Sequence, residues 1–256
     1  MPPLELPGVT LCAATSVNLS ATLSALNHSL DGAEFADCLL LTDAAITAPD
    51  RRIRIVPIER LSSGSAYSEF MLRRLPDFIS TPHVLVIQWD GFVLDPRRWD
   101  SAFLDFDYVG APWPQFGDRH DVGNGGFSLR SQRLLHACRA PAFQLAHPED
   151  VAIGRLNRTY LEREHGIRFA DRETAARFSF ERELPSSPTF GFHGIFNMIP
   201  LLGADRFWEL YLKLDDRGTA FLDYSLLMRQ LGSGASSMRR RYQLTRDRIR
   251  GLFKRW

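Results

Sequence analysis

The chain has 256 residues, of which 45% are hydrophobic, and its formal net charge is +1. This apolar content suffices for one large domain or two small ones, and the near-neutral charge gives no general case for nucleic-acid binding. The three cysteines, Cys12, Cys38 and Cys138, are too few and too scattered for a disulfide framework, so buried thiols in a reducing cytoplasm are expected. The first residues lack the pattern of a signal peptide, and no apolar run approaches the roughly 20 residues that cross a bilayer.

The first part of the chain predicts alternating strands and helices. Apolar segments predict strands over 9–14, 38–41, 53–58 and within 83–90, the third of them at a sheet edge because Pro57 lacks a ladder donor. The first helix is expected after a cap at Asn18, with an apolar stripe at Leu19, Leu23, Leu26 and Leu30. A second helix is expected from Tyr67 to Leu75, closed by Pro76. This order predicts an α/β fold with a mainly parallel central sheet flanked by helices.

Two nucleotide-binding motifs are absent from the sequence. No G-x-G-x-x-G follows the first predicted strand, and no G-x-x-x-x-G-K-[ST] occurs anywhere, which argues against dinucleotide dehydrogenases and P-loop ATPases. A Rossmann-like domain with a different ligand stays open.

The second part predicts shorter elements. A surface loop is expected over 112–121, a strand over 127–130, a helix capped by Ser131, and a helix opened by 147–150 that ends at Gly166. Half-buried strands are expected over 167–169 and 178–180, and glycines interrupt an aromatic segment at 191–194.

One predicted strand ends in a carboxylate. The run from Val84 to Ile87 is apolar throughout, as in strands buried on both faces, and it leads to Asp90 and Gly91. Ligands of open α/β sheets collect at the carboxyl ends of strands, and a carboxylate suits Mg²⁺ or Mn²⁺. His193 supplies an imidazole that Mn²⁺ accepts. Taken singly, Asp90 also suits an ordinary turn, and a lone histidine among aromatic residues also suits the core.

Two further motifs have a functional and a structural interpretation. Gly123, Gly125 and Gly126 precede a strand, where they allow a substrate close to the backbone or simply form a tight turn. Glu149 and Asp150 begin a helix, where a carboxylate serves as a general base or merely stabilises the helix dipole.

The combination of these motifs resembles a known family. The matching segments are 87–92, 108–114, 123–130, 147–150 and 190–194, which read IQWDGF, YVGAPWP, GNGGFSLR, HPED and FGFHG. They resemble a bacterial glycosyltransferase-like family with the nucleotide-diphosphosugar transferase (GT-A) fold. The Gly-Gly-Phe-Ser and Glu-Asp segments are similar to those of β-1,4-galactosyltransferases.

The resemblance implies a role for each matched residue. It makes Asp90 the metal-binding acid of a D-x-D motif, His193 the late metal ligand, and Asp150 the catalytic base. Glu149 would contact a sugar hydroxyl. The implied substrate-binding residues are Gln88, Trp89, Gly125, Gly126 and Trp113. Thr15 and Asp43, which end the first and second predicted strands, are weaker candidates for the nucleotide. Arg73 suits the diphosphate less well than it suits an ordinary solvated charge on its helix. Gln88 departs from the motif, because an amide stands where the first Asp belongs and the site has one negative charge fewer.

These roles imply a metal-dependent glycosyltransferase that uses Mn²⁺ or Mg²⁺. The enzyme would move a sugar from a nucleotide-diphosphate donor to a hydroxyl of a glycan or lipid-linked acceptor, as in bacterial polysaccharide biosynthesis. A separate base implies single displacement with inversion, whereas glycosidases pair two carboxylates around the sugar. A catalytically inactive nucleotide-sugar or glycan-binding module is the alternative. A sugar nucleotidyltransferase is disfavoured, since residues 12–16 lack its glycine-rich basic loop.

The C-terminal segment differs in composition from the rest. Residues 238–256 contain eight Arg or Lys and one Asp, a net charge of +7 that leaves −6 for the remainder. An apolar stripe at Ile249, Leu252, Phe253 and Trp256 runs among Arg246, Arg248, Arg250, Lys254 and Arg255. The sequence therefore predicts a transferase domain over 1–235 and a basic amphipathic tail over 236–256. The tail either binds an anionic membrane surface, at the inner face of the cytoplasmic membrane, or packs on the domain.

Overall fold

A computed structural model describes residues 2–232 and 234–253, which form two compact units, Met1–His193 and Gly194–Trp256. Each unit is described by itself. The domain boundary expected at 235/236 falls within the second unit, at the start of its last helix.

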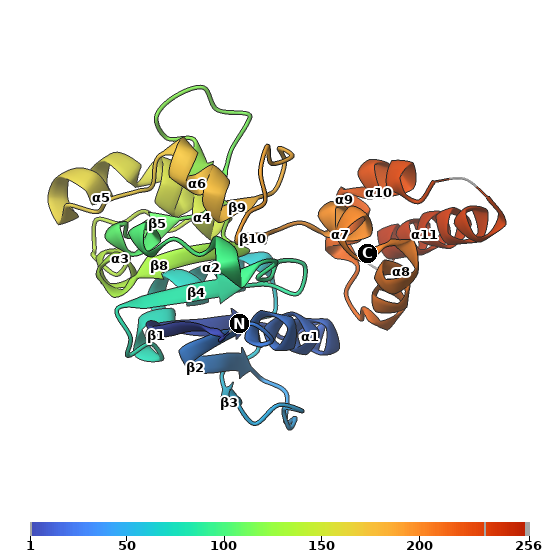
Figure 1. The fold of residues 1–256 in the computed structure, drawn as a ribbon, viewed down its shortest axis with the longest axis horizontal. Coiled ribbons are helices and arrows are strands. Elements are labelled where there is room, and N and C mark those ends of the chain that lie inside the picture. Colours follow the sequence, from blue (N-terminus) through green and yellow to red (C-terminus); the bar gives the residue numbers. More distant parts are fainter. Residues whose placement is uncertain (1, 233, 254–256) are drawn as a thin grey trace. The chain divides into compact units, whose positions relative to one another are not determined.

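The first unit is built on a six-stranded sheet in the order β3-β2-β1-β4-β8-β5 (Figure 1). The first four of these strands run parallel, β8 runs antiparallel to β4, and β5 runs antiparallel to β8. The strands are β1 (Leu4–Ala14), β2 (Ala33–Thr42), β3 (Ile53–Pro57), β4 (His83–Ile87), β5 (Tyr108–Val109) and β8 (Phe127–Ser131). The predicted α/β class with a mainly parallel sheet is confirmed.

Two small sheets accompany the main one. The pairs are β6 (Ala111–Pro112) with β7 (Val122–Gly123), and β9 (Ser179–Phe180) with β10 (Gly191–Phe192). The α-helices of this unit are α1 (Leu19–Leu30), α2 (Gly64–Arg73), α3 (Gln132–Ala137), α4 (Glu149–Val151), α5 (Arg158–His165) and α6 (Arg172–Phe178). Short 3-10 turns cover Leu75–Asp77, Pro96–Arg98 and Ser101–Asp105, and a π-helical turn covers Ala152–Leu156.

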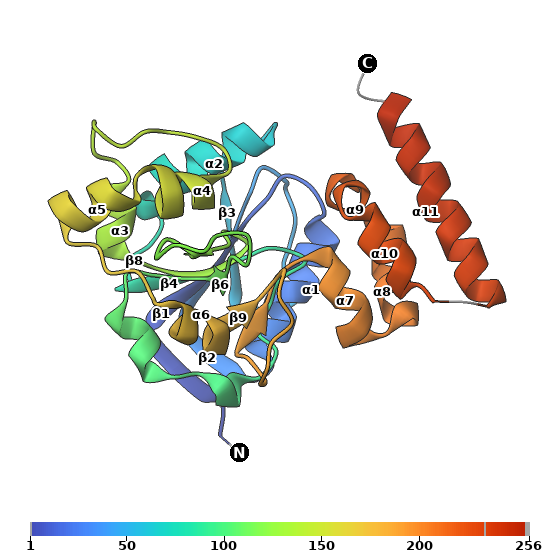
Figure 2. The same ribbon diagram turned by 90° about the horizontal axis from the view of Figure 1, so that it is seen from above.

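Helices enclose the sheet on both faces (Figure 2). Met71 of α2 packs with Cys12, Leu39 and Val84 on one face, while α1 lies against β1 and β2. Because side chains alternate along a strand, the intervening residues of β4 point to the opposite face. All four apolar residues from Val84 to Ile87 are therefore buried, as expected of a central strand. The three cysteines are buried as well.

Several local predictions differ from the structure. Residues 167–169 form no strand and contribute a single bridge from Phe169 to Tyr108, while the strand expected over 178–180 is shortened because α6, capped by Asp171, continues to Phe178. The expected long helix before Gly166 is divided by the π-helical turn. Asn18 stands at the helix start in a left-handed conformation and its side chain makes no capping bond. Ser131, by contrast, caps α3 as predicted, because its hydroxyl accepts the Leu134 N–H at 3.0 Å.

The second unit is helical. Its helices are α7 (Ile195–Leu202), α8 (Ala204–Lys213), α9 (Gly218–Leu222), α10 (Tyr224–Gln230) and α11 (Ala235–Phe253). Buried side chains from four of the helices form its core: Ile195, Phe207, Tyr211, Leu227 and Leu244. Within residues 2–232 and 234–253, no helix has the length and apolar character needed to span a bilayer.

Candidate functional site

The sheet topology brings two of the predicted motifs together. Ile87, the last residue of β4, pairs with Phe127, the first residue of β8. Because these strands are antiparallel, the residues that follow β4 meet those that precede β8. The Gln88 N–H accordingly donates to the Gly126 carbonyl at 2.9 Å. The glycine-rich segment and the Gln88–Asp90 turn thus lie at the same edge of the sheet.

A small parallel sheet brings the late histidine to this edge. Strands β9 and β10 run parallel, so Glu181 and His193 emerge at matching ends. Gly191 of β10 also forms a bridge with Val93, three residues after Asp90. His193 is therefore anchored beside the Asp90 turn although 103 residues separate the two in sequence.

His193 lies between two carboxylates. Its Nε2 is 3.4 Å from Asp90 Oδ1, and its Nδ1 is 3.4 Å from Glu181 Oε1. Burial alone would lower the pKa of the imidazole, but Asp90 and then Glu181 raise this pKa to about 10. Asp90 itself is 1% exposed, and its Oδ2 has no hydrogen-bond partner among the described residues. An unpaired buried carboxylate oxygen is costly, which suggests a partner such as a cation.

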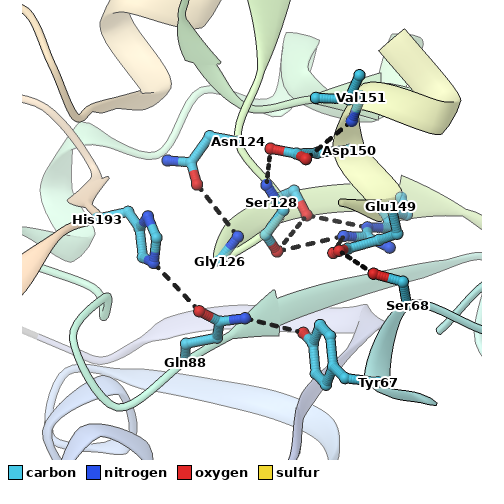
Figure 3. A network of polar contacts seen from close by, with 12 residues as sticks. Tyr67, Ser68, Gln88, Asn124, Gly126, Ser128, Glu149, Asp150, Val151 and His193 are labelled. Atoms are coloured by element: carbon cyan, nitrogen blue, oxygen red, sulfur yellow. Dashed lines mark hydrogen bonds and ion pairs between the residues drawn. The ribbon is translucent and has the colours of Figure 1, made fainter. Parts of the chain in front are cut away.

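Gln88 occupies the position at which the family resemblance leads us to expect the first acid of a D-x-D motif. Its amide nitrogen donates to the Tyr67 hydroxyl at 3.1 Å, and its Oε1 lies 3.3 Å from His193 Nε2 (Figure 3). Gln88 Oε1, Asp90 Oδ1 and His193 Nε2 therefore lie close together. One carboxylate, one amide oxygen and one imidazole fit a divalent cation that takes its other ligands from a substrate. Among the described residues, no group of three or more His, Cys, Asp or Glu side chains is arranged to hold a metal ion.

Glu149 belongs to a buried ion pair. Its Oε1 accepts from Arg130 Nη2 at 3.0 Å, and the two side chains are 5% and 0% exposed. Arg130 also donates to Ser128 Oγ and to the Gly125 carbonyl, and Ser68 Oγ lies 3.4 Å from Glu149 Oε2. Burial opposes the charge on Arg130, but Glu149 together with Tyr108 and Tyr67 outweighs this effect, and the pKa of Arg130 is raised. The carboxylate of Glu149 is thus held by protein groups.

Asp150, unlike Glu149, accepts its hydrogen bonds from backbone N–H groups. Its Oδ2 accepts the Gly125 N–H at 3.1 Å and its Oδ1 accepts its neighbour's N–H, that of Val151, at 2.8 Å. Burial and then the charge of Glu149 raise the pKa of Asp150 to about 6. A carboxyl group with this pKa exchanges protons near neutral pH, as a general base must.

The two glycines are required by the protein itself. A Cβ at Gly125 would lie 2.2 Å from Glu149 Oε1, and a Cβ at Gly126 would lie 2.0 Å from His193 Nε2. The sequence suggested a substrate close to this backbone. In the structure, Glu149 Oε1 and His193 Nε2 lie next to this backbone, and contact of the two glycines with a substrate stays a prediction.

The other predicted substrate-binding residues lie outside this group of contacts. Trp89 and Trp113 are buried, and the Trp113 ring fills the space above Gly123. Thr15 and Asp43 follow β1 and β2 at the carboxyl edge of the sheet, and the Thr15 hydroxyl is bonded to the Val17 backbone. Contact of these four residues with a substrate stays a prediction.

Arg73 lies at a cavity that none of the other site residues lines. Its Nη1 donates to the Cys138 carbonyl at 2.9 Å. It lines a cavity of about 630 Å³ beside the end of β3, together with Arg60, Arg74 and Phe70. None of the residues lining this cavity is among Asp90, Asp150 and His193.

Sequence analysis missed two charged residues of the site. Arg130 was identifiable in principle, because an arginine within an otherwise buried strand requires an acidic partner. Glu181 follows β9 as His193 follows β10, and the parallel pairing of these strands places both residues at matching ends. That pairing, however, was not visible in the sequence.

Comparisons with known proteins give the following findings. No curated protein matches the chain. A crystal structure of the apo-form glycosyltransferase GlyE from Streptococcus pneumoniae TIGR4 is similar with a TM-score of 0.44 and 14% identity, over 72% of this chain and 53% of that one. The chain thus spans about half the length of GlyE in that structure. A family model described as "Protein of unknown function (DUF5672)" matches residues 50–193, more than half of the 256, and the chain therefore belongs to this family.

Proposed function

We propose that the chain is a metal-dependent glycosyltransferase that moves a sugar from a nucleotide-diphosphate donor to an acceptor hydroxyl. One observation carries this proposal. Asp150 accepts the N–H of Gly125, and the His193 ring packs against the next residue, Gly126. An acid suited to proton transfer and an Asp90–His193 pair suited to a cation are thus held by adjacent backbone positions.

The donor set supports a divalent cation. Asp90 Oδ1 and Gln88 Oε1 would hold Mn²⁺ or Mg²⁺ together with His193 Nε2, whose proton the cation would have to displace because the pKa of this imidazole is raised. The unpaired Oδ2 of Asp90 favours a positive partner. A bound cation would stabilise the negative charge that develops on the diphosphate leaving group. The neutral amide of Gln88 leaves the site one charge less negative than a pair of acids would.

The chain's own residues would carry the proton transfer. Asp150 takes the proton of the acceptor hydroxyl as its oxygen attacks C1 of the donor sugar, and the C1–O bond to the diphosphate breaks with its electron pair leaving on the diphosphate oxygen. Arg130 neutralises the adjacent Glu149. Because Asp150 acts as a base and not as a nucleophile, we propose a single displacement with inversion at C1. The acceptor we propose is a glycan or a lipid-linked sugar.

One observation favours a second candidate function. Gln88 bridges Tyr67 and His193 without carrying charge, and both ring nitrogens of His193 already face carboxylates. A module that binds a nucleotide sugar or a glycan without turnover would tolerate this arrangement.

A donor screen tests these proposals. UDP-, GDP- and dTDP-sugars are added to the protein with Mn²⁺, with Mg²⁺ or with a chelator, and both the melting temperature and the release of nucleoside diphosphate are measured. We expect one of the nucleotide sugars to raise the melting temperature only when a cation is present. Without an acceptor, slow hydrolysis of this donor should release its nucleoside diphosphate. Asp90→Ala should remove the effect of the cation on donor binding.

The outcomes separate the two candidates. Cation-dependent stabilisation without nucleotide release, with any acceptor tried, supports the binding module. No stabilisation by any nucleotide sugar contradicts both. An unchanged cation titration in Asp90→Ala contradicts its assignment as a ligand.

A further inference from the structure

Helix α11 carries a row of apolar side chains on its exposed face. Met238, Tyr242 and Ile249 are 68%, 71% and 50% exposed. Their spacing of four and seven residues places them on one side of an α-helix, with Thr245 between them. Of the stripe predicted from the sequence, Ile249 belongs to this row. Trp256, Lys254 and Arg255 lie outside the described residues, as do the side chains of Leu252 and Phe253.

The opposite side of α11 packs within the second unit. Ser237, Leu244 and Asp247 are buried, and Asp247 accepts from Tyr211 and Arg217. The helix therefore already has a core-facing side, which differs from the Met238 row. Within the second unit, Ile249 therefore does not lie on the core-facing side of α11.

Arginines flank the exposed row. Helix α11 contains six arginines and one aspartate, a net charge of +5, and that aspartate is the buried Asp247. Arg239, Arg248 and Arg250 are exposed. The exposed side of the described helix therefore presents positive charge and apolar groups, with no acidic side chain among them.

We propose that this side of α11 docks on an anionic lipid surface, with Met238, Tyr242 and Ile249 entering the headgroup region and the arginines contacting lipid phosphates. Basic helices with an exposed apolar row bind such interfaces through both forces. A nucleic acid would satisfy the arginines but leave the apolar row in water, so the row favours lipid. Docking requires no sugar donor, and its test is therefore independent of transfer activity.

Vesicle flotation of the full chain tests the proposal. The vesicles consist of phosphatidylcholine alone, or of phosphatidylcholine with about a third phosphatidylglycerol. We expect the protein to float with the anionic vesicles only, and to be released as KCl rises from roughly 50 to roughly 500 mM, because salt screens the attraction. Absence of binding to anionic vesicles, or equal binding to both kinds, overturns the proposal.

The electrostatic contribution is tested by removing two exposed arginines of α11. Arg239→Gln with Arg250→Gln should weaken partitioning about 25-fold, at about fivefold for each arginine. The matched control removes the same charge from exposed residues of the first unit, Arg51→Gln with Arg119→Gln, and should leave partitioning unchanged.

The apolar row has its own variant and control. Met238→Ser with Ile249→Ser should weaken partitioning at least tenfold, whereas Leu222→Ser, at an 85% exposed leucine of α9, should not. Equal losses in variant and control contradict a specific face. Two results together would identify a nucleic-acid surface instead and overturn the proposal. A DNA duplex would prevent flotation of the wild-type protein, and the Met238→Ser/Ile249→Ser variant would bind the vesicles as well as wild type does.

Discussion

At the scale of single residues, the adjacent acids Glu149 and Asp150 have different environments. Glu149 is paired with the fully buried Arg130, whereas Asp150 is bonded only to backbone N–H groups of Gly125 and Val151. The pair therefore resolves into one fixed anion and one acid whose proton is exchangeable near neutral pH. The sequence shows only that the two acids are adjacent, and it does not indicate that their environments differ.

The first prediction concerns Asp150 and pH. Its pKa is raised to about 6, so a base at this position is ionised above that pH and protonated below it. If Asp150 is the base, transfer should rise about tenfold per pH unit below 6 and level off above. Asp150→Asn should lower the transfer rate about 10² to 10⁴-fold and keep the donor-induced rise in melting temperature. Joint loss of donor binding and transfer would contradict the role of base.

The second prediction concerns the ion pair. Arg130→Met removes the cation that pairs with the buried Glu149 carboxylate, and should lower the free energy of unfolding by about 3–5 kcal/mol. Urea unfolding measures this change. The double variant Arg130→Met/Glu149→Leu should recover part of the loss, since no charge is then left unpaired. Arg97→Met is the control, because the Arg97–Asp95 pair is on the surface and its loss should leave the free energy of unfolding nearly unchanged.

At the scale of elements, the site depends on where β8 begins. The antiparallel entry of β8 places its preceding glycines against the end of β4, and the parallel β9–β10 pair delivers His193 above them. The backbone of Gly125 and Gly126 is therefore the common support of the acid and the imidazole.

The third prediction concerns this support. Gly126→Ala would place a Cβ 2.0 Å from His193 Nε2, so the ring must shift from its position between Asp90 and Glu181. We expect cation affinity to fall at least tenfold, together with a stability loss of about 1–3 kcal/mol from overpacking. Gly117→Ala is the matched control, since nothing lies within 4 Å of its Cβ position, and it should change neither quantity. Titration calorimetry with Mn²⁺ measures the affinity; equal affinities in the two variants would refute the support role.

At the scale of the whole molecule, the chain divides where the family match ends. The first unit ends at His193, which is also the last residue matched by the family model, and every residue of the candidate site lies in it. The helical unit from Gly194 onward carries the exposed basic face of α11. We infer a division of labour, with chemistry in the first unit and lipid attachment in the second.

The fourth prediction tests this division by truncation. A chain that ends at residue 194 should fold, shown by a cooperative thermal transition, and should retain donor-induced stabilisation while losing vesicle flotation. A chain that ends at 235 should lose flotation as well, because α11 is removed. If only the longer of the two truncated chains folds, the domain boundary predicted from the sequence at 235/236 is the better description.

The sequence alone determined the α/β class, the buried strand that leads into the Asp90 turn and the helix cap at Ser131. These are local properties, because apolar periodicity and cap chemistry act over a few residues. It also singled out Asp90, Asp150, Gly126 and His193, through motif order and family resemblance. The tertiary structure decided which of them touch: that Glu181 flanks His193, that Arg130 holds Glu149, and that side chains fill the space above the glycines. Strand pairing fixes these contacts between distant segments, and no pattern confined to one segment specifies which other segment it will meet.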